Sequence, residues 1–320
     1  MSDGPRRIAV TGATGYVGAR LVRALEATGG VEHVLAIDVH PPPGTPGPKT
    51  TFLRQDVALP FRRALADHEI DTVVHLAYVL RPSHDRLATH RVNVGGTSNL
   101  LDACAEAGVR KIVYLSSTSV YGAHPDNPPM LTENSPTRPV PGFQYSEDKA
   151  ASEALILEHA DRAPDVAATV LRCCPTVGPR ADNFILRAFL KPFLVKVRGA
   201  DPSMQLIHED DLIGCLMRCI VGDAHGVYNL AGDGTVRWSK MAAMLGRRLV
   251  SLPAPLLYGA TEVSWRLRLQ HDSPSSGLNF IRYPWTASTE KIKAELGVEP
   301  RYSSREAWEA FAQRHRGSRR

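Results

Sequence analysis

The sequence predicts an α/β fold, a doubly wound parallel sheet with a smaller carboxy-terminal lobe. Three observations support this prediction: apolar strand-like runs alternate with amphipathic helical segments up to residue 173, a glycine-rich turn follows the first run, and the alternation loosens beyond about residue 178. Strands that alternate with helices pair in parallel and carry helices on both faces of the sheet. We therefore expect one sheet domain of Rossmann type over residues 1–178, and mainly a second lobe over residues 179–320, with some segments returning to the main sheet.

The expected strands are short apolar runs, and Thr72–Ala77 has the near-continuous apolar character of a strand buried on both faces. The expected helices repeat apolar residues every three or four positions. The proline-rich run 41–48 must be a loop, because proline cannot donate to a sheet ladder. In chain order the strands are Arg7–Val10, Val34–Asp38, Thr51–Leu53, Thr72–Ala77, Lys111–Ser116 and Ala168–Cys173. The helices are Tyr16–Thr28, Val92–Ala107 and Tyr145–His159, and later elements are Asp211–Val221, Val227–Ala231, Trp238–Leu245 and Ser304–Gln313.

Composition argues against several other classes of protein. The chain has 320 residues, of which 43% are hydrophobic and 22% charged, as in a globular protein with a sizeable core. It contains no run of 18 apolar residues, and its amino terminus lacks the apolar core of a signal peptide. We therefore expect no membrane partner and a cytoplasmic location. Much of the net charge of +5 lies at the two ends, which is typical of a solvated tail and does not indicate nucleic-acid binding. These end residues are Arg6, Arg7, Arg314, Arg316, Arg319 and Arg320.

The cysteines lack the spacing of a metal site or a redox pair. No two form a Cys-x-x-Cys pair, and the last two have helical spacing in a largely apolar run. We interpret all of them as buried thiols in a reducing compartment and expect no bound metal. They are Cys104, Cys173, Cys174, Cys215 and Cys219.

A glycine-rich turn joins the first strand to the first helix. Gly12 permits the tight turn, Gly15 lets the backbone approach a diphosphate, and Gly18 lets the helix pack close to the sheet. The start of the helix offers free N–H groups and the positive end of the helix dipole to phosphates. Three glycines alone are also compatible with a purely structural turn. The full segment is Thr11-Gly12-Ala13-Thr14-Gly15-Tyr16-Val17-Gly18.

Asp38 makes NAD the predicted cofactor. It lies 20 residues after Gly18, at the end of the second strand, where a carboxylate accepts hydrogen bonds from ribose hydroxyls and repels a 2′-phosphate. His40 is a poor replacement for the arginine that NADP would require. Asp56, followed by Val57 after the third strand, either contacts the adenine amino group or lies at a solvated loop end.

A second signal is the pair Tyr145 and Lys149, which share one face of a helix because they are four residues apart. Tyrosine has a reference pKa of about 10, and a general base near neutrality needs it lowered by roughly 3 units. A nearby ammonium has the right sign of charge for this shift. Alone, the pair could be a surface contact. However, the serine-rich segment 116–119 ends the fifth strand, where open α/β sheets bind ligands, and a hydroxyl there can hold a substrate oxygen. Asn93, after the fourth strand, can position the cofactor backbone or a water.

An ordered set of motifs runs through most of the chain: TGATGYVG at 11–18, Asp38, Asp56-Val57, His75-Leu76-Ala77, Asn93 to Thr97, Ser116 to Gly122, YSEDK at 145–149, Leu171-Arg172, Gly178-Pro179 and Ile207 to Leu212. With this set, the sequence resembles the extended short-chain dehydrogenase/reductase family, also called the NAD-dependent epimerase/dehydratase family, over about residues 6–315. The resemblance implies that Tyr145 is the catalytic acid or base, that Lys149 lowers its pKa and binds the nicotinamide ribose, and that Ser117 holds the reacting oxygen. It also implies a homodimer through helices at about 93–107 and 145–160. Further implied cofactor contacts are Leu76, Ala77, Asn93 and Pro175.

Departures from the family pattern bear on the reaction. Members that dehydrate or decarboxylate nucleotide sugars place an acidic residue just after the active serine or threonine, whereas Thr118 and Ser119 follow Ser117. This difference argues against both reactions. Sugar-nucleotide epimerases usually carry an asparagine where Pro175 stands and a diphosphate-binding arginine near the position of Met204, so a charge-assisted contact is missing here. Substitutes for that contact, or ordinary surface charges, are Arg180, Arg187 and Arg198.

Other residues are less informative. His208, Asp210 and Asp211 are expected to organise the junction between the lobe and the sheet, and His75 to lie near the cofactor without titrating. The aromatic set Phe280, Tyr283 and Trp285 either lines the substrate pocket or packs the lobe.

Three functions remain open. The main prediction is an NAD-dependent dehydrogenase or reductase that transfers hydride between nicotinamide C4 and a small-molecule secondary alcohol or ketone. The second is an epimerase of a sugar or sugar nucleotide that oxidises, flips and re-reduces its substrate with retained NAD. The third is a non-catalytic NAD-binding regulator, against which the intact Ser117, Tyr145 and Lys149 argue.

Overall fold

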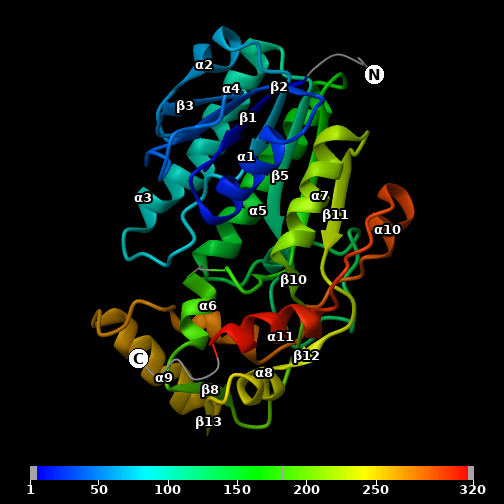
Figure 1. The fold of residues 1–320 in the computed structure, drawn as a ribbon. Coiled ribbons are helices and arrows are strands. Elements are labelled where there is room, and N and C mark those ends of the chain that lie inside the picture. The colour runs from blue at the N-terminus through cyan, green and yellow to red at the C-terminus, as the bar shows by residue number, and fades with distance from the viewer. Residues whose placement is uncertain (1–5, 182–183, 316–320) are drawn as a thin grey trace.

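The computed structural model describes residues 6–181 and 184–315. Its largest sheet has seven parallel strands (Figure 1). Its strand order is β11-β6-β5-β4-β1-β2-β3, and every neighbouring pair is parallel. The predicted fold class is confirmed. The strands are β1 (Arg6–Thr11), β2 (Val31–Asp38), β3 (Thr50–Arg54), β4 (Thr72–His75), β5 (Lys111–Ser117), β6 (Ala167–Cys173) and β11 (Gly226–Leu230).

Helices cover both faces of the sheet because strand side chains alternate between the two faces. Ile8 and Val10 pack in the cluster that contains α1 (Tyr16–Glu26) and α7 (Glu209–Val221). Ala9 points to the opposite face, where it joins the cluster beneath the other helices. Those helices are α2 (Arg62–Asp67), α4 (Gly96–Ala107) and α5 (Gln144–Arg162).

Within the sheet domain, the helical segments differ from the sequence-based expectation at two places. The six-residue α2 has too few turns to show a helical repeat, and it was not predicted. The expected helix Val92–Ala107 comprises most of a π-helical turn (Arg91–Gly95) and then α4, and the helical run begins earlier than predicted, with α3 (Arg86–His90). The π-helical turn ends at the pair Gly95-Gly96, whose low helix propensity favours an irregular turn.

The order of the sheet reverses between β1 and β4, which defines a topological switch point at their carboxyl ends. β11 joins the sheet from the carboxy-terminal part of the chain, with Gly226 opposite Thr169 and Leu230 opposite Cys173. The expected strand Val227–Ala231 therefore belongs to the main sheet.

The lobe lies below the carboxyl edge of the sheet in Figure 1. Phe280, Trp285 and Trp308 are buried together in its core, so two members of the predicted aromatic set pack the lobe. Its helices are α6 (Phe184–Phe189), α8 (Trp238–Met244), α9 (Ala254–Arg266) and α11 (Ser304–His315). Its short strands are β7 (Thr176–Val177), β8 (Phe193–Val197), β9 (Ser203–Met204), β10 (Ile207–His208), β12 (Val236–Arg237) and β13 (Arg248–Leu252). Helix α10 (Glu290–Leu296) instead packs beside β11, with Ile292 in the cluster that contains α1 and α7.

All five cysteines are buried free thiols. The helices within residues 6–181 and 184–315 are too short or too polar to span a bilayer, and the same residues contain no cluster of three or more His, Cys, Asp or Glu side chains suited to a metal ion. Arg314, near the end of this range, is exposed, and the predicted tail residues Arg316, Arg319 and Arg320 lie outside it.

Candidate active site

The glycine turn lies at the switch point and is packed too tightly for larger residues. Gly12 has φ +67°, and a Cβ added to it would lie 2.7 Å from the Ala77 nitrogen. A Cβ on Gly18 would lie 2.1 Å from the Gly12 oxygen. Both glycines therefore hold α1 and the turn in close contact, as the sequence predicts.

The amino terminus of α1 fits the diphosphate of a dinucleotide. Its N-cap, Gly15, provides no side-chain hydrogen bond, and the first turn contains no acidic residue. The first intrahelical bond of this end runs from Ala19 N to Gly15 O, so the preceding N–H groups, those of Tyr16, Val17 and Gly18, have no helical acceptor. Such N–H groups, at the positive end of the helix dipole, form a ready anion site.

Asp38 lies beside this turn at the end of β2. Its Oδ2 accepts a hydrogen bond from Thr14 N at 3.0 Å, and its Oδ1 accepts one from His40 N at 3.1 Å. The carboxylate keeps further lone pairs for ribose hydroxyls. Arg54, opposite Asp38 in the β2–β3 register, donates from Nε to Val39 O at 3.2 Å. Sequence reasoning missed Arg54, although its position at the end of the neighbouring strand could have indicated it.

Asp56 and Val57, the residues predicted to contact the adenine, follow β3 and differ in what their side chains contact. Asp56 Oδ1 accepts a hydrogen bond from Ala58 N at 2.9 Å and thereby closes its own turn. Val57 is buried, and its side chain lies so near Gly96 that a Cβ there would be 2.7 Å from Val57 Cγ2.

Leu76 and Ala77 are held at the end of β4 by a shared acceptor. Thr11 Oγ1 accepts from the nitrogens of both residues at 3.2 Å and lies 2.7 Å from His75 Nδ1. The other ring nitrogen of His75 lies 3.1 Å from Thr97 Oγ1. Burial, with a smaller effect of Lys149, lowers the pKa of His75 to about 3, so the ring is neutral at physiological pH.

Asn93 is fully buried, and protein groups engage both ends of its amide. Oδ1 accepts from Val79 N at 2.8 Å, and Nδ2 donates to Asp148 Oδ2 at 3.1 Å. The side chain thus braces the loop after β4 against α5. Its Asp148 partner, 55 residues away, could not be identified from the sequence.

Ser117, Tyr145 and Lys149 converge at the carboxyl end of β5. Ser117 ends that strand, whereas Tyr145 and Lys149 lie in the first turns of α5. Tyr145 is hydrogen-bonded to the Ser117 side chain. Lys149 Nζ donates to Leu115 O at 2.7 Å. The three predicted residues are therefore brought together.

The pKa values of this cluster are shifted mainly by burial. Burial raises the pKa of Tyr145 to about 12, although the hydrogen bond with Ser117 opposes the shift. Burial lowers the pKa of Lys149 to about 7, with Glu153 opposing the shift. The expected lowering of the Tyr145 pKa is therefore wrong for the protein without its cofactor. Desolvation raises this pKa by more than the hydrogen bond with Ser117 lowers it.

Two tyrosines that sequence reasoning missed enclose the lysine. Lys149 Nζ lies 3.8 Å from the ring centroid of Tyr78 and 4.8 Å from that of Tyr114. Tyr78 also donates a hydrogen bond to Tyr145 O at 2.9 Å and contacts the Tyr145 ring edge-on. Tyr78 directly follows Ala77 at the end of β4, which is the signal that could have identified it.

A buried ion pair between Arg172 and Glu153 lies next to the site. Arg172 on β6 contacts Glu153 of α5 through Nε at 2.9 Å and Nη2 at 2.5 Å. Ser116 Oγ donates to the other Glu153 oxygen at 2.7 Å, and Arg172 Nη1 donates to Tyr121 OH at 2.9 Å. The network ties β5, β6 and α5 together at Ser116, the residue before Ser117.

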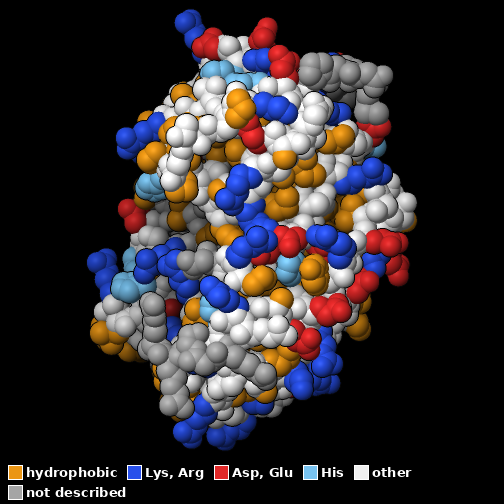
Figure 2. Space-filling view, in the orientation of Figure 1, with side chains coloured by type: hydrophobic (Ala, Val, Ile, Leu, Met, Phe, Trp, Pro, Cys, Tyr) orange, Lys and Arg blue, Asp and Glu red, His pale blue; other side chains and the backbone are white. Residues whose placement is uncertain are grey.

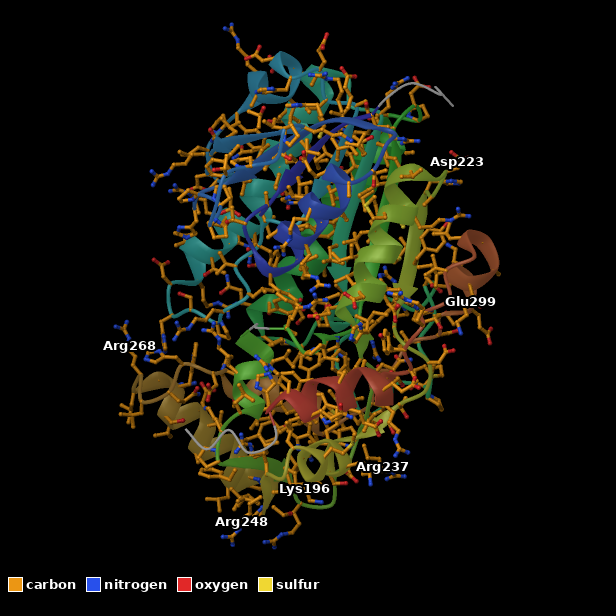
Figure 3. All side chains as sticks on the ribbon, viewed as in Figure 1. Lys196, Asp223, Arg237, Arg248, Arg268 and Glu299 are labelled. Atoms are coloured by element: carbon orange, nitrogen blue, oxygen red, sulfur yellow. The ribbon has the colours of Figure 1, made fainter. Side chains whose placement is uncertain are left out.

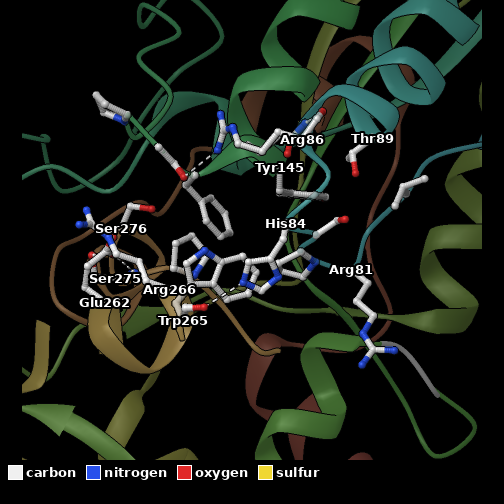
Figure 4. Close-up of a pocket in the computed structure, with 18 of the residues that line it drawn as sticks. Arg81, His84, Arg86, Thr89, Tyr145, Glu262, Trp265, Arg266, Ser275 and Ser276 are labelled. Atoms are coloured by element: carbon white, nitrogen blue, oxygen red, sulfur yellow. Dashed lines mark hydrogen bonds and ion pairs between the residues drawn. The ribbon is translucent and has the colours of Figure 1, made fainter. Parts of the chain in front are cut away.

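A cavity of about 570 Å³ lies beside Tyr145, between the loop after β4, the start of α5 and α9 of the lobe (Figure 4). His84 stacks on Trp265 with ring centroids 4.0 Å apart, which joins the loop to α9. Arg86 pairs with Glu147 at 2.8 Å at the start of α5. The cavity thus has apolar and cationic walls next to the predicted catalytic tyrosine.

The segments where nucleotide-sugar epimerases carry polar contacts are packed in this chain. Met204 is buried in the lobe core, and Gln205 exchanges hydrogen bonds with the Ala287 backbone. Pro175, whose oxygen accepts from Ile207 N at 3.1 Å, lies between β6 and β7. Tyr283 only borders the lobe core.

The three arginines considered as substitutes lie in different places. Arg180 pairs with Glu209 and Asp210, in each case at 3.0 Å. Arg187 lies on α6, and Arg198 follows β8 with its side chain exposed.

The Ile-His-Glu-Asp-Asp segment organises the junction between lobe and sheet. Asp210 pairs with Arg20 of α1, and Asp211 pairs with Arg301 at 3.2 Å. His208 stacks on Tyr302 with ring centroids 4.0 Å apart. These contacts confirm the structural role predicted for the segment.

Comparison with known proteins agrees with this geometry. A model of the NAD dependent epimerase/dehydratase family matches residues 8–231. An uncharacterized protein of Mycobacterium tuberculosis is 30% identical over 317 residues, which cover 96% of this chain and 83% of the relative. A dTDP-glucose 4,6-dehydratase of Streptomyces griseus is 33% identical over 258 residues, which cover 74% of this chain and 76% of that enzyme.

Among solved structures, MoeE5 in complex with UDP-glucuronic acid and NAD is similar to this chain, with a TM-score of 0.74 and 27% identity. The match covers 98% of this chain and 99% of that one. The family that the sequence resembles is thereby confirmed. The chain belongs to the NAD-dependent epimerase/dehydratase family of extended short-chain dehydrogenase/reductase enzymes.

Proposed function

We propose that this chain is an NAD(H)-dependent oxidoreductase acting on a secondary alcohol or ketone through Ser117, Tyr145 and Lys149. The observation that carries the proposal is the convergence of these side chains at one strand end, beside a cavity bordered by Tyr145. Hydrogen bonding between Ser117 and Tyr145 supports it further. Residues 179–320 supply the far wall of the cavity, so we assign substrate selection mainly to this lobe.

The residues of the glycine turn fit NAD. We assign its diphosphate to the first N–H groups of α1, its adenosine ribose to Asp38, and its adenine to the region of Asp56 and Val57. Leu76, Ala77, Asn93, Lys149 and Pro175 complete the proposed cofactor site. When bound, NAD supplies the hydride acceptor or donor and, in its oxidised form, a positive charge near Tyr145.

The chain's own residues then handle the proton. Ser117 Oγ, which accepts from Ser119 N at 3.1 Å, is placed to bind the reacting oxygen. Tyr145 takes the hydroxyl proton during oxidation and returns it during reduction. Protonated Lys149 favours the tyrosinate form, and the Leu115 carbonyl fixes its ammonium group at 2.7 Å.

A second candidate is an epimerase of a sugar nucleotide. The similarity to MoeE5, whose complex contains UDP-glucuronic acid, favours this alternative. The packed Met204 and the absence of arginine at that position favour the first candidate. Dehydration has less support despite the dehydratase relative, because Thr118 and Ser119 offer hydroxyls and no carboxylate next to Ser117.

One assay separates the two candidates. The chain is incubated with NAD and a panel of secondary alcohols and sugar nucleotides, while reduced nicotinamide is followed by absorbance and the products by chromatography. Accumulating reduced cofactor supports the dehydrogenase, whereas a changed sugar configuration without net reduction supports the epimerase. A panel that yields neither outcome would favour the non-catalytic regulator.

Asp38→Ala is expected to lower NAD affinity by about 10–100-fold, because a charge-assisted hydrogen bond to the ribose is lost. NADP affinity should rise relative to NAD, since the repulsion is removed while Arg54 remains opposite position 38. Fluorescence titration with both cofactors measures the change, and the exposed Asp67→Ala serves as control. Equal losses for NAD and NADP would contradict the assignment of Asp38.

Lys149→Met is expected to abolish activity but stabilise the protein near neutral pH. The folded-state pKa of Lys149 is about 7 against an ordinary 10.5, so between these values the unfolded chain binds more protons. Stability of the wild type should therefore rise with pH in this window, and the variant should lack that contribution. Urea unfolding at several pH values in the window measures both slopes. Equal slopes of stability against pH in the wild type and the variant would contradict the lowered pKa of Lys149.

The proposed homodimer pairs α4 and α5 with their copies. Solution scattering at several concentrations should give the mass of two chains. A monomeric mass throughout would contradict this prediction.

A further inference from the structure

Helix α9 turns an apolar face toward solvent. Leu256, Val263 and Leu267 are exposed by 57%, 56% and 63%, and they follow one another at helical spacing with Ala260 between them. Leu269, just beyond the helix, is 74% exposed. Surface helices normally present polar residues to water, so this pattern is inverted. We refer to Leu256, Ala260, Val263, Leu267 and Leu269 as the α9 face.

The inner side of the helix accounts for its position. Leu257 is buried and packs with Val197 and Leu278 in a separate small core. α9 is therefore anchored in the lobe by one side only, and Figure 1 places it at the outer edge of the molecule. Figure 2 shows hydrophobic and basic side chains together at that lower left edge.

The end of α9 exposes the side chains of Arg268 and Leu269 to solvent, and Arg268 adopts an unfavourable left-handed backbone conformation there. Arg268 has φ +57°, and among the described residues only Glu69 shares a positive φ without being glycine. Leu269 N donates to Ser264 O at 2.8 Å and Arg268 N to Trp265 O at 2.9 Å, a Schellman cap that usually contains glycine. The residue after such a glycine usually packs back on the helix, whereas Leu269 is exposed. Figure 3 shows Arg268 at the periphery beside α9.

The charge around the α9 face is basic. Arg266, Arg268 and His271 are exposed. The acidic residues of the stretch 254–272 are Glu262, which is partly buried, and Asp272, which is paired with Lys191. Glu262 is already engaged by Arg266 at 2.7 Å and by Ser275 Oγ at 2.7 Å. Residues 179–320 as a whole contain 21 Lys and Arg against 14 Asp and Glu.

We propose that the α9 face docks on an anionic phospholipid bilayer. Exposed leucines and a valine insert among acyl chains, and Arg266 and Arg268 meet the headgroup charge. A second copy of the chain fits less well, because a twofold contact through this face would bring the arginines of both copies together. This surface contact requires no membrane-spanning segment, so it revises only the expectation of no membrane partner. Trp265 and Arg266 also line the cavity beside Tyr145, so docking brings that cavity to the bilayer.

Sedimentation with vesicles tests the proposal independently of catalysis. The full chain is mixed with vesicles of phosphatidylcholine alone or with about one third phosphatidylglycerol, at low and high salt. We expect binding to the anionic vesicles, weakening by at least about tenfold without the anionic lipid or at high salt. Absence of binding, or equal binding to both vesicle types, would overturn the proposal.

Matched variants locate the contact. Leu267→Glu with Leu269→Glu, and separately Arg266→Gln with Arg268→Gln, should each weaken binding by about tenfold or more. Val221→Glu, at an exposed residue of α7 outside this patch, should leave it unchanged. Arg268→Gly, which suits the αL position, should weaken binding without lowering the melting temperature. Unchanged vesicle binding in the leucine variant, or a mass that halves in it, would overturn the proposal, the latter in favour of a second copy.

Discussion

Replacing Tyr145 with phenylalanine is expected to lower kcat by about 10²–10⁴-fold, the usual contribution of a positioned general acid or base. The change removes only the hydroxyl that is hydrogen-bonded to Ser117, so NAD affinity should stay near the wild-type value. Steady-state kinetics and cofactor titration on the same preparations separate the two effects.

A matched control for this variant is Tyr228→Phe. Tyr228 is a buried tyrosine on β11 whose hydroxyl lies 2.9 Å from Glu295, and it takes no part in the proposed site. It should retain activity while losing some stability. If Tyr145→Phe kept activity within about twofold of the wild type, Tyr145 would not be the acid or base.

Glu153→Ala is expected to lower the free energy of unfolding by about 3–5 kcal/mol, because it leaves a buried guanidinium without its carboxylate. The side chains of Arg172 and Glu153 are only 6% and 2% exposed. The hydroxyl of Ser116 loses its acceptor as well. Urea denaturation followed by circular dichroism measures the loss.

The double variant Glu153→Met with Arg172→Met shows whether the unpaired charge causes this loss. Replacing both partners of a buried ion pair with apolar residues of similar volume is often nearly neutral. We therefore expect the double variant to be more stable than Glu153→Ala. Equal stability of the two variants would mean that lost packing, and not the unpaired charge, destabilises the single one.

The main architecture could be predicted because it follows from local patterns. Alternating strands and helices predict a parallel sheet, and the spacing from Gly18 to Asp38 predicts a turn and an acidic residue at adjacent strand ends. The gathering of Ser117, Tyr145 and Lys149 was expected from the same rule, since each lies at the carboxyl edge of the sheet. Contacts between distant segments were beyond this reasoning, as with Asn93 and Asp148 or Tyr78 and Lys149.

Burial explains the clearest error. The sequence indicates that Lys149 lies near Tyr145, and a nearby ammonium lowers a tyrosine pKa. It does not indicate that both groups are desolvated, which raises the pKa of Tyr145 to about 12. Helix α9 was also not predicted. Apolar residues lie on both its inner and its outer side, and this removes the amphipathic pattern on which helix prediction depends.

Transfer of deuterium from labelled cofactor shows whether this chain moves hydride to a ketone with the help of Tyr145. NADH carrying deuterium at nicotinamide C4 is incubated with the chain and candidate ketones, and the products are analysed by mass spectrometry. We expect one deuterium on the carbinol carbon with the wild type and at least about 100-fold slower labelling with Tyr145→Phe. Label that stays in the cofactor with every ketone, or that moves equally fast in Tyr145→Phe, would contradict this expectation.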